Sequence, residues 1–456
     1  MPVPAVIEDI LRKHNIEYGI TKSHPSADLS IVPDTIKSTI LQDSQGKIQV
    51  IYCADSILDL DALKQFIDRD LRATNRNDAK SLCDKVNLDR LPTLPYVLGL
   101  EVVVDQRLLD IAELKLDTGS EYSIINIDNS QFKALIGDAL TGNFTVRESQ
   151  LKASSLDDIS DIAEITIAVA NFTQLRIKQR LEETLEFPPL PDTAQRIIKL
   201  RVDPNADIQD LTDIVESDPA LAAQVVSWAA SPYYAAPGKI KSVHDSIVRV
   251  LGFDLVLNLS LGLALGKTLN LPKDIAKGFT PYWQQAVYAA TAVEALVGAI
   301  PPKERPAMGM AYLSGLLHNF GYLILAEVFP PYFSNICRYQ EANPFSNHCH
   351  IDRHLLGVTR EQLGAWLMRL WSMPDEICDA LRFQNEDRCD NDAYANLLFI
   401  AMRLLRSQGI GDAPATPIPD AVFERLHLNR DKATEAIEKM MESATELNMM
   451  AANMAA

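Results

Sequence analysis

One histidine-rich stretch of the sequence has a spacing that could hold a metal ion. It reads Asn347-His348-Cys349-His350-Ile351-Asp352-Arg353-His354. On a helix, His350 and His354 would lie one turn apart, which is how two imidazoles clip a transition metal. The stretch lacks an upstream carboxylate and a second fixed pair of ligands, so a solvated helix start is the alternative interpretation. No other metal candidate emerges from spacing alone, and we predict neither a bound metal nor a cofactor.

Composition limits the remaining possibilities. The chain has 456 residues, 47% of them hydrophobic, which suffices for two buried cores. Its formal charge of −18 repels a phosphate backbone and disfavours DNA binding. The longest apolar stretch, 255–265, is far shorter than the ~20 residues of a membrane-spanning helix. Six cysteines without a CxxC pair are typical of free thiols in a reducing compartment. We expect a cytoplasmic protein with protein or small-ligand partners, not a membrane or DNA partner.

The elements that would position a site fall into two groups along the chain. Strand patterns at 48–54, 102–104 and 122–127, with a helix capped by Asp59, predict an α/β (α+β) domain over residues 1–138. Periodicity fades after Asp138, and we interpret 139–180 as a linker carrying a helix that begins near Phe172.

Beyond this linker almost every segment carries residues that typically begin or end a helix. Asp218-Pro219 is a cap followed by proline at the first helical position, and similar patterns predict helices at 284–298, 308–328, 360–371 and 374–383. This predicts an all-α domain over 181–390. C-terminal helices and a Met-rich tail follow over 391–456, where ordinary packing is the main interpretation and a soft partner surface the alternative.

The helical domain resembles the HDOD family. The resemblance covers roughly 200 residues, with the motifs in the family's order, and implies a degenerate HD phosphohydrolase-like fold that serves in signalling. The motifs are Leu185-Glu186-Phe187-Pro188-Pro189-Leu190-Pro191, Ile214-Val215-Glu216-Ser217-Asp218-Pro219-Ala220-Leu221, Ile240-Lys241-Ser242-Val243-His244-Asp245-Ser246-Ile247, Gly315-Leu316-Leu317-His318-Asn319-Phe320-Gly321 and Leu370-Trp371-Ser372-Met373-Pro374.

The same resemblance implies that the metal site of HD phosphohydrolases is missing. Their metal is held by several His and Asp side chains and lowers the pKa of a bound water. Here Gln284 stands where an upstream histidine is expected, His318-Asn319 replaces the His-Asp pair, and Gln384-Asn385 replaces later histidines. One histidine cannot hold a hydrolytic metal. We interpret His318 as a core histidine satisfied by hydrogen bonds, with a residual ligand as the alternative.

The first domain resembles the YbaK and prolyl-tRNA-synthetase-associated domains, which hydrolyse mischarged aminoacyl-tRNA. The resemblance covers about 130 residues. It implies a role for Lys37 in orienting the ester carbonyl or terminal ribose, and ligand binding at Lys37, His24, Gly99 and Asp105. The stretches that carry it are Leu11-Arg12-Lys13-His14-Asn15-Ile16-Glu17-Tyr18, Asp34-Thr35-Ile36-Lys37-Ser38-Thr39-Ile40-Leu41 and Leu98-Gly99-Leu100-Glu101-Val102-Val103-Val104-Asp105.

Two observations weigh against deacylation. The family's glycine-containing loop is replaced by the proline-rich stretch 89–96, which removes amides that could bind substrate. Residues 1–138 carry 15 Lys or Arg against 22 Asp or Glu, so they form no electrostatic funnel for tRNA. The alternative interpretation of Lys37 is a solvent-facing lysine.

Three functions follow from these patterns. The leading hypothesis is a non-catalytic cytoplasmic signalling protein, in which a deacylase-like sensor binds an aminoacyl or other small ligand and an HDOD domain provides the output. The alternative is an aminoacyl-tRNA editing deacylase acting through Lys37. A metal-dependent phosphodiesterase is disfavoured by Gln284, Asn319, Gln384 and Asn385.

Overall fold

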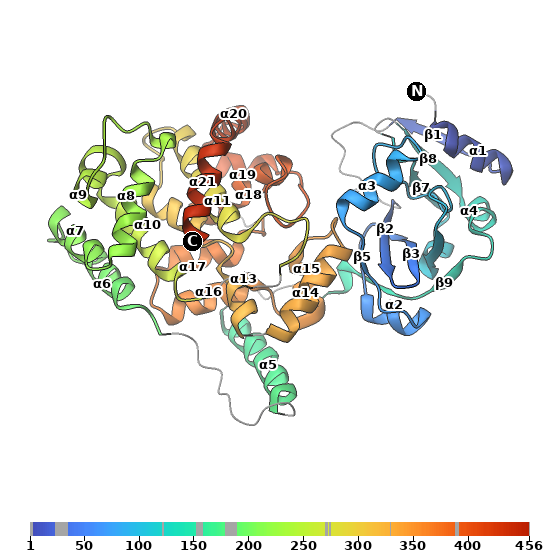
Figure 1. The fold of residues 1–456 in the computed structure, drawn as a ribbon, viewed down its shortest axis with the longest axis horizontal. Coiled ribbons are helices and arrows are strands. Elements are labelled where there is room, and N and C mark those ends of the chain that lie inside the picture. The colour runs from blue at the N-terminus through green and yellow to red at the C-terminus, as the bar shows by residue number, and fades with distance from the viewer. Residues whose placement is uncertain are drawn as a thin grey trace. The chain divides into compact units, whose positions relative to one another are not determined.

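The computed structural model describes residues 3–22, 35–120, 123–151, 158–177, 189–269, 272, 275–328, 330–387 and 392–455. The chain divides into two compact units (Figure 1). The first unit is Met1–Ala153 with Asp274–Gly278 and Ser334–Leu355, and the second unit is Ser154–Lys273 with Phe279–Phe333 and Leu356–Ala456. A two-domain chain with an α/β first part and an all-α second part, as the sequence predicts, is confirmed.

The first unit is built on a five-stranded mixed sheet in the order β5-β2-β3-β6-β9. A three-stranded antiparallel sheet, β1-β8-β7, and a two-stranded pair, β10-β4, complete it. Its elements are α1 (Ala5–Lys13), β1 (Gly19–Lys22), β2 (Ile36–Asp43), β3 (Gly46–Cys53), β4 (Ser56–Leu58), α2 (Leu60–Ile67), β5 (Arg72–Ala73), α3 (Arg76–Asp84), β6 (Glu101–Asp105), β7 (Glu113–Asp117), β8 (Ser123–Asp128), α4 (Asn129–Ile136), β9 (Leu140–Gly142) and β10 (Thr145–Arg147).

Local sequence explains the central hairpin of this sheet. β2 and β3 pair antiparallel with Asp43 opposite Gly46, and the Asp43 carboxylate accepts the amides of Gln45 and Gly46 at 2.8 and 3.1 Å. Asp at the start of such a turn and Gly46 at φ +139° are the residues this geometry favours. The predicted cap of the next helix is confirmed, because the Asp59 side chain accepts the amides of Asp61 and Ala62.

The five-stranded sheet is buried on both faces. One face packs with α1, α4 and the smaller sheet around a core that includes Ile36, Ile51 and Val104. The other face packs with α2 and, from far along the chain, with Tyr339, Ala342 and Ile351. Because strand side chains alternate, residues 37, 39 and 41 of β2 share this second face.

The helices that cover this second face come from the region read as part of the helical domain. They are α14 (Pro330–Ala342), from Ser334 onward, and α15 (His348–Leu356), through Leu355. We call Ser334–Leu355 the docked segment. The sequence gives no signal of this arrangement, because both helices have ordinary amphipathic patterns.

The stretch expected to be a linker after Asp138 is partly a sheet. β9 pairs parallel with β6, and β10 pairs antiparallel with β4. Each strand has only three residues, too few to give a periodic pattern, and each depends on a partner strand. The linker helix begins at Asp158 and not near Phe172.

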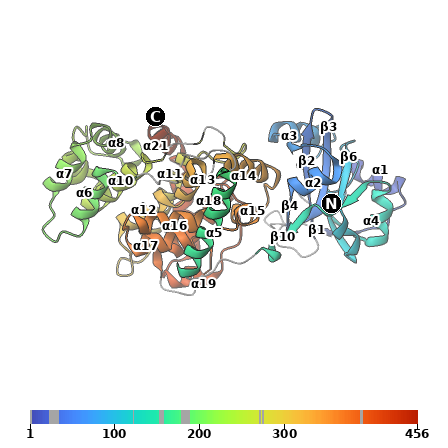
Figure 2. The same cartoon turned by 90° about the horizontal axis from the view of Figure 1, so that it is seen from below.

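The second unit consists of helices and connecting loops, and its described residues form no strand. Figure 2 shows α6, α7, α8 and α10 gathered at one end of it. Its helices are α5 (Asp158–Ile177), α6 (Asp192–Arg201), α7 (Ile208–Glu216), α8 (Pro219–Ala229), α9 (Val243–Ser246), α10 (Phe253–Gly266), α11 (Tyr282–Ala299), α12 (Met308–Leu317), α13 (Phe320–Val328), α16 (Arg360–Leu370), α17 (Asp375–Phe383), α18 (Ala393–Ser407), α19 (Asp420–Arg425), α20 (Arg430–Met441) and α21 (Ala444–Ala455).

The centre of this unit is the packing of α10, α11 and α12. Gly315 permits the close approach of α12 to α11, since a Cβ there would lie 2.6 Å from Ala290 Cα. The C-terminal helices α20 and α21 pack on α11, and Met440, Met450 and Met454 are buried. In the described part of the chain, no helix combines the length and apolar character needed to cross a bilayer.

Candidate functional site

Lys37 lies on β2, on the sheet face that the docked segment covers. Its side chain is buried, only 7% exposed, so it does not face solvent. Its Nζ donates to Ser346 Oγ at 3.4 Å. A buried ammonium needs polar partners to offset its lost hydration. Ser346 of the docked segment supplies one such polar partner to Lys37, the lysine to which the resemblance to YbaK domains assigns a role.

Glu148 completes the surroundings of Lys37. Burial opposes ionisation of this carboxyl, but hydrogen bonding with His350, the nearby Lys37 charge and the Ser346 hydroxyl outweigh burial and lower the pKa of Glu148. His350 Nδ1 lies 3.2 Å from Glu148 Oε2. The result is a mixed-charge cluster of Lys37, Glu148, Ser346 and His350. The sequence predicts Lys37 at this site and singles out His350 only as part of a possible metal clip, and Glu148 falls in the stretch interpreted as linker.

Strands β2 and β4 fix the docked segment next to this cluster. The Asn343 side chain accepts the Leu58 amide at 2.6 Å and donates to the Leu58 carbonyl at 3.1 Å. Asn343 thus pairs with strand β4 much as a neighbouring strand would. Thr39, on the same face as Lys37, donates to the Ala342 carbonyl at 3.3 Å. These contacts place the loop between α14 and α15 over the Lys37 face.

His354, the other residue of the possible metal clip, also contacts a carboxylate. His354 Nε2 lies 3.1 Å from Asp59 Oδ2, and the Tyr339 hydroxyl donates to Asp59 Oδ1 at 2.8 Å. Burial opposes ionisation of Asp59, but hydrogen bonds from His354, the Ala62 amide and Tyr339 lower the pKa of Asp59 to about 2. His350 and His354 therefore serve different carboxylates, neither forming a metal clip nor lying at a solvated helix start.

The other residues predicted for this site have different surroundings. Gly99 is exposed in a turn at φ +66°, where its amide donates to the Tyr96 carbonyl. Asp105 is fully buried at the end of β6, where it accepts the Arg107 amide and guanidinium and the Thr145 hydroxyl. His24 lies outside the described residues.

The proline-rich stretch lies against the face opposite Lys37. Its Pro92 carbonyl accepts hydrogen bonds from Ser38 Oγ at 2.9 Å and from Gln49 Nε2 at 3.0 Å. Ser38 alternates with Lys37 on β2, so its side chain lies on the opposite face. This stretch therefore packs the core and does not border Lys37.

The ammonium of Lys37 can bind and orient a polar group. In this structure it already donates a hydrogen bond to the hydroxyl of Ser346. An ester carbonyl or ribose hydroxyl aimed at the ammonium would have to displace Ser346. Binding of such a group at Lys37 would therefore compete with the contact that the docked segment makes there.

The residues expected at the degenerate HD site lie mostly together in the second unit. Asn319 Nδ2 is 3.5 Å from Gln285 Oε1, and Gln384 Nε2 donates to the His318 carbonyl at 2.7 Å. His318 Nδ1 is 2.8 Å from the Gly315 carbonyl oxygen, and this local contact lies where the predicted helix 308–328 divides into α12 and α13. Asn385 Nδ2 donates to Glu361 Oε1 at 2.7 Å.

Gln284 differs from this expectation. It donates to Asn448 Oδ1 of α21 at 2.8 Å, while its neighbour Gln285 is buried beside Asn319. Consecutive helix residues point about 100° apart, so only one of the two can face Asn319. The sequence predicted the helix, but it assigned the position facing Asn319 to Gln284 and not to Gln285.

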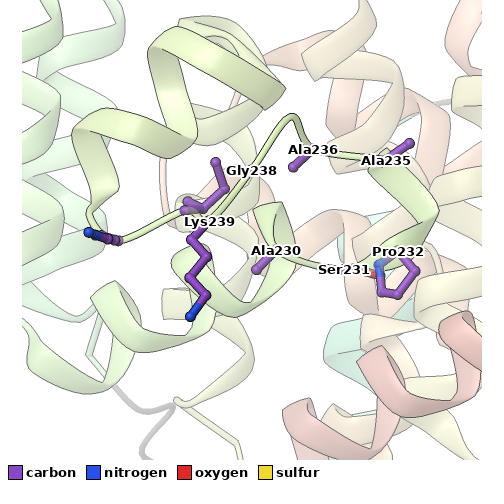
Figure 3. A pocket seen from close by; sticks show the side chains of 9 residues that line it. Ala230, Ser231, Pro232, Ala235, Ala236, Gly238 and Lys239 are labelled. Atoms are coloured by element: carbon purple, nitrogen blue, oxygen red, sulfur yellow. The ribbon is translucent and has the colours of Figure 1, made fainter.

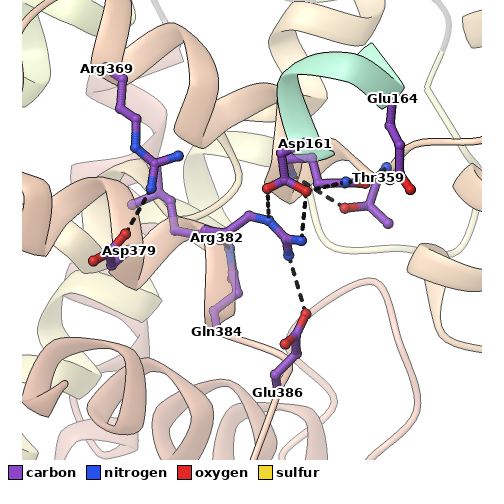
Figure 4. A network of polar contacts seen from close by, with 10 residues as sticks. Asp161, Glu164, Thr359, Arg369, Asp379, Arg382, Gln384 and Glu386 are labelled. Carbon is purple, nitrogen blue, oxygen red and sulfur yellow. Dashed lines mark hydrogen bonds and ion pairs between the residues drawn. The ribbon is translucent and has the colours of Figure 1, made fainter. Parts of the chain in front are cut away.

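Helix α5 adds charged partners that the sequence did not indicate. Asp161 of α5 forms a buried ion pair with Arg382, whose Nη2 is 3.0 Å from Asp161 Oδ1 (Figure 4). Gln362 Nε2 donates to Asp161 at 2.6 Å and to Glu164 at 3.0 Å. Arg382 also contacts Glu386 at 3.2 Å. A polar cluster of three carboxylates, one guanidinium and one amide, hydrogen-bonded to one another, thus occupies this part of the helical unit.

This cluster is poorly suited to a hydrolytic metal. Its carboxylates Asp161, Glu164 and Glu361 accept hydrogen bonds from Arg382, Gln362 and Asn385, so they do not surround an open metal position. Among the described residues, no group of three or more His, Cys, Asp or Glu side chains is arranged to hold a metal ion.

Comparisons with known proteins identify the family of the helical domain. Residues 187–387 match the family model described as HDOD domain. A solved structure described as a "Putative signal transduction protein" from Marinobacter aquaeolei VT8 is 40% identical, covers 100% of both chains and has a TM-score of 0.90. The chain belongs to the family of HDOD-domain proteins.

Two further relatives are more distant. A structure described as a "putative trans-editing enzyme for prolyl tRNA synthetase" is 15% identical, covering 32% of this chain and 98% of that one, with a TM-score of 0.28. An "Uncharacterized protein" from Treponema pallidum (strain Nichols) is 20% identical over 268 residues, 58% of this chain and 51% of that protein. The chain thus spans about half the length of this curated relative.

Proposed function

We propose that this chain is a non-catalytic signalling protein, in which a deacylase-like unit senses a small ligand and an HDOD domain provides the output. The description of the Marinobacter relative as a signal transduction protein supports a signalling role. The paired amide cluster supports an HDOD domain that does not hydrolyse phosphodiesters. The proposal includes a cytoplasmic location, which the free thiols of Cys53 and Cys83 favour.

The observation that carries the proposal is the contact of Lys37 with Ser346. The docked segment lies within the residues that match the HDOD model, yet it covers the face of the sheet where an aminoacyl ligand would bind. A ligand that takes Lys37 from Ser346 would thus release a segment that lies within the HDOD match. A ligand shifts such an equilibrium only by its preference for the undocked state.

Hydrogen exchange on the full chain tests this proposal. The probes are non-hydrolysable aminoacyl-adenosine amides carrying different amino acids. At least one should speed amide exchange in residues 338–354, because their helices open more readily once Asn343, Ser346 and the Ala342 carbonyl lose their contacts with β2 and β4. Lys37→Ala should abolish the response, whereas Lys64→Ala, an exposed lysine of α2, should keep it.

The alternatives give different outcomes. If no probe changes exchange in residues 338–354, the sensor role is rejected. If a probe acts equally on the Lys37→Ala protein, the ligand binds elsewhere. The editing deacylase remains a separate hypothesis, and its assay is hydrolysis.

A further inference from the structure

A hollow of about 380 Å³ opens in the second unit, on the loop between α8 and α9 (Figure 3). It is lined by residues 230–232, 235–236 and 238–241. Its volume is at the lower end of the range of small-molecule sites. Part of the wall is apolar, formed by alanines, Pro232 and Ile240, and two of its side chains are the lysines Lys239 and Lys241.

The charge of this loop is opposite to that of the chain. The chain carries −18 overall, whereas residues 230–252 contain Lys239, Lys241 and Arg249 and one acid, Asp245. That acid is already engaged, since Asp245 Oδ2 accepts the Lys241 amide at 3.1 Å and its Oδ1 lies 3.6 Å from Arg249 Nη1. Among the described residues, neither lysine of the hollow lies within ion-pair distance of a carboxylate. The side chains of this loop therefore carry a net positive formal charge next to the hollow.

Hydrogen bonds fix the shape of the loop. Arg249 donates to the carbonyls of Pro237 and Lys239, so these two acceptors are already occupied. The chain turns through positive φ at Ala235 (+46°) and Gly238 (+80°). A preformed site loses little ordering entropy when a ligand binds.

We propose that this hollow binds a small organic phosphate of mononucleotide size. Lys239 and Lys241 would pair with the phosphate, as point charges on flexible stems commonly do. The apolar wall around Pro232 and Ile240 would pack against the organic part, which inorganic phosphate lacks. The net charge of the chain and the size of the hollow disfavour a polynucleotide. This inference is independent of the Lys37 face.

Isothermal titration of the full chain at low salt tests the proposal. The probes are the four nucleoside 5′-monophosphates, with inorganic phosphate and adenosine as the two separated halves. At least one monophosphate should bind about tenfold more tightly than either half. Lys239→Ala/Lys241→Ala should weaken this binding about tenfold or more, because two charge-assisted contacts are lost.

A matched control separates local from overall charge. Lys303→Ala/Lys432→Ala removes two exposed lysines elsewhere in the same unit and should leave the affinity unchanged. All four lysines are exposed, so both variants should unfold at the wild-type temperature. The proposal is overturned if no monophosphate binds, if inorganic phosphate or adenosine binds as tightly, or if the two double variants behave alike.

Discussion

Lys37 Nζ lies 3.4 Å from Ser346 Oγ, and the two buried residues are 309 positions apart in the sequence. The contact joins a strand of the N-terminal sheet to a loop within the HDOD match. It gives this buried lysine an internal hydroxyl partner. The stability and the ligand response of the first unit should therefore both depend on the docked segment.

Asn343 should be a main anchor of that segment. Asn343→Ala removes the side chain that satisfies the buried amide and carbonyl of Leu58, which should cost about 2–4 kcal/mol of the free energy of unfolding. Urea unfolding of the full chain measures this cost. Asn143→Ala, an exposed amide of the same unit, should cost less than about 0.5 kcal/mol. Equal costs for the two variants would argue against anchoring by Asn343.

The Asp161–Arg382 pair should hold α5 in the helical unit. Arg382→Met leaves the Asp161 charge buried without its cation and should cost about 3–5 kcal/mol. Arg382→Met/Asp161→Leu should cost less than the sum of the single changes, since no lone charge remains. Arg369→Met removes the more exposed pair with Asp379 and should cost at most about 1 kcal/mol. Additive costs at Asp161 and Arg382 would contradict the pairing.

Glu294 should make the stability of the helical unit fall as the pH rises. Burial raises the pKa of Glu294 to about 7, although a hydrogen bond from Tyr234 opposes this shift. The folded-state pKa lies above the model-peptide value of 4.5, so the stabilising effect is complete below about 4.5 and is lost as the pH rises through 7. Glu294→Gln should flatten the unfolding free energy between pH 5 and 8. The exposed Glu304→Gln should leave that slope unchanged, and equal slopes in all three proteins would refute the assignment.

The amide cluster around His318 and Asn319 should not retain a transition metal. Protein dialysed against Zn²⁺ or Mn²⁺ and then freed of excess metal should carry no stoichiometric ion by elemental analysis. One equivalent of metal ion that remains bound after washing would contradict the conclusion that this cluster lacks a set of metal ligands. A metal lost with His350→Ala would instead assign the ion to the docked segment.

Much of the fold was accessible from the sequence because its signals are local. The Asp59 cap, the strands around Val103 and the helical punctuation after Pro191 all depend on residues within one turn or strand of each other. Family motifs then identified the HDOD fold, since they occur in a fixed order. These signals are enough to define the two folds.

The site itself depends on contacts that local patterns do not encode. Ser346 approaches Lys37 because a loop within the HDOD match folds onto β2. Glu148 lies near Lys37 because β10 pairs with β4 and the Glu148 amide donates to the Asp55 carbonyl. Asp161 belongs to a helix whose start the sequence placed too late. The Gln284 prediction missed the helix phase by one residue. A single sequence carries no trace of such long-range pairings, whereas correlated changes at positions 37 and 346 among relatives would reveal them.

Lys37 is covered by the docked segment, and we propose that its face of the sheet does not hydrolyse aminoacyl esters. The most direct test is hydrolysis of a panel of mischarged aminoacyl-tRNAs by the full chain, beside Lys37→Ala and Lys64→Ala. The covered face predicts that all three proteins release amino acids no faster than buffer does. Turnover by the wild type and Lys64→Ala that disappears in Lys37→Ala would contradict the claim and identify an editing deacylase.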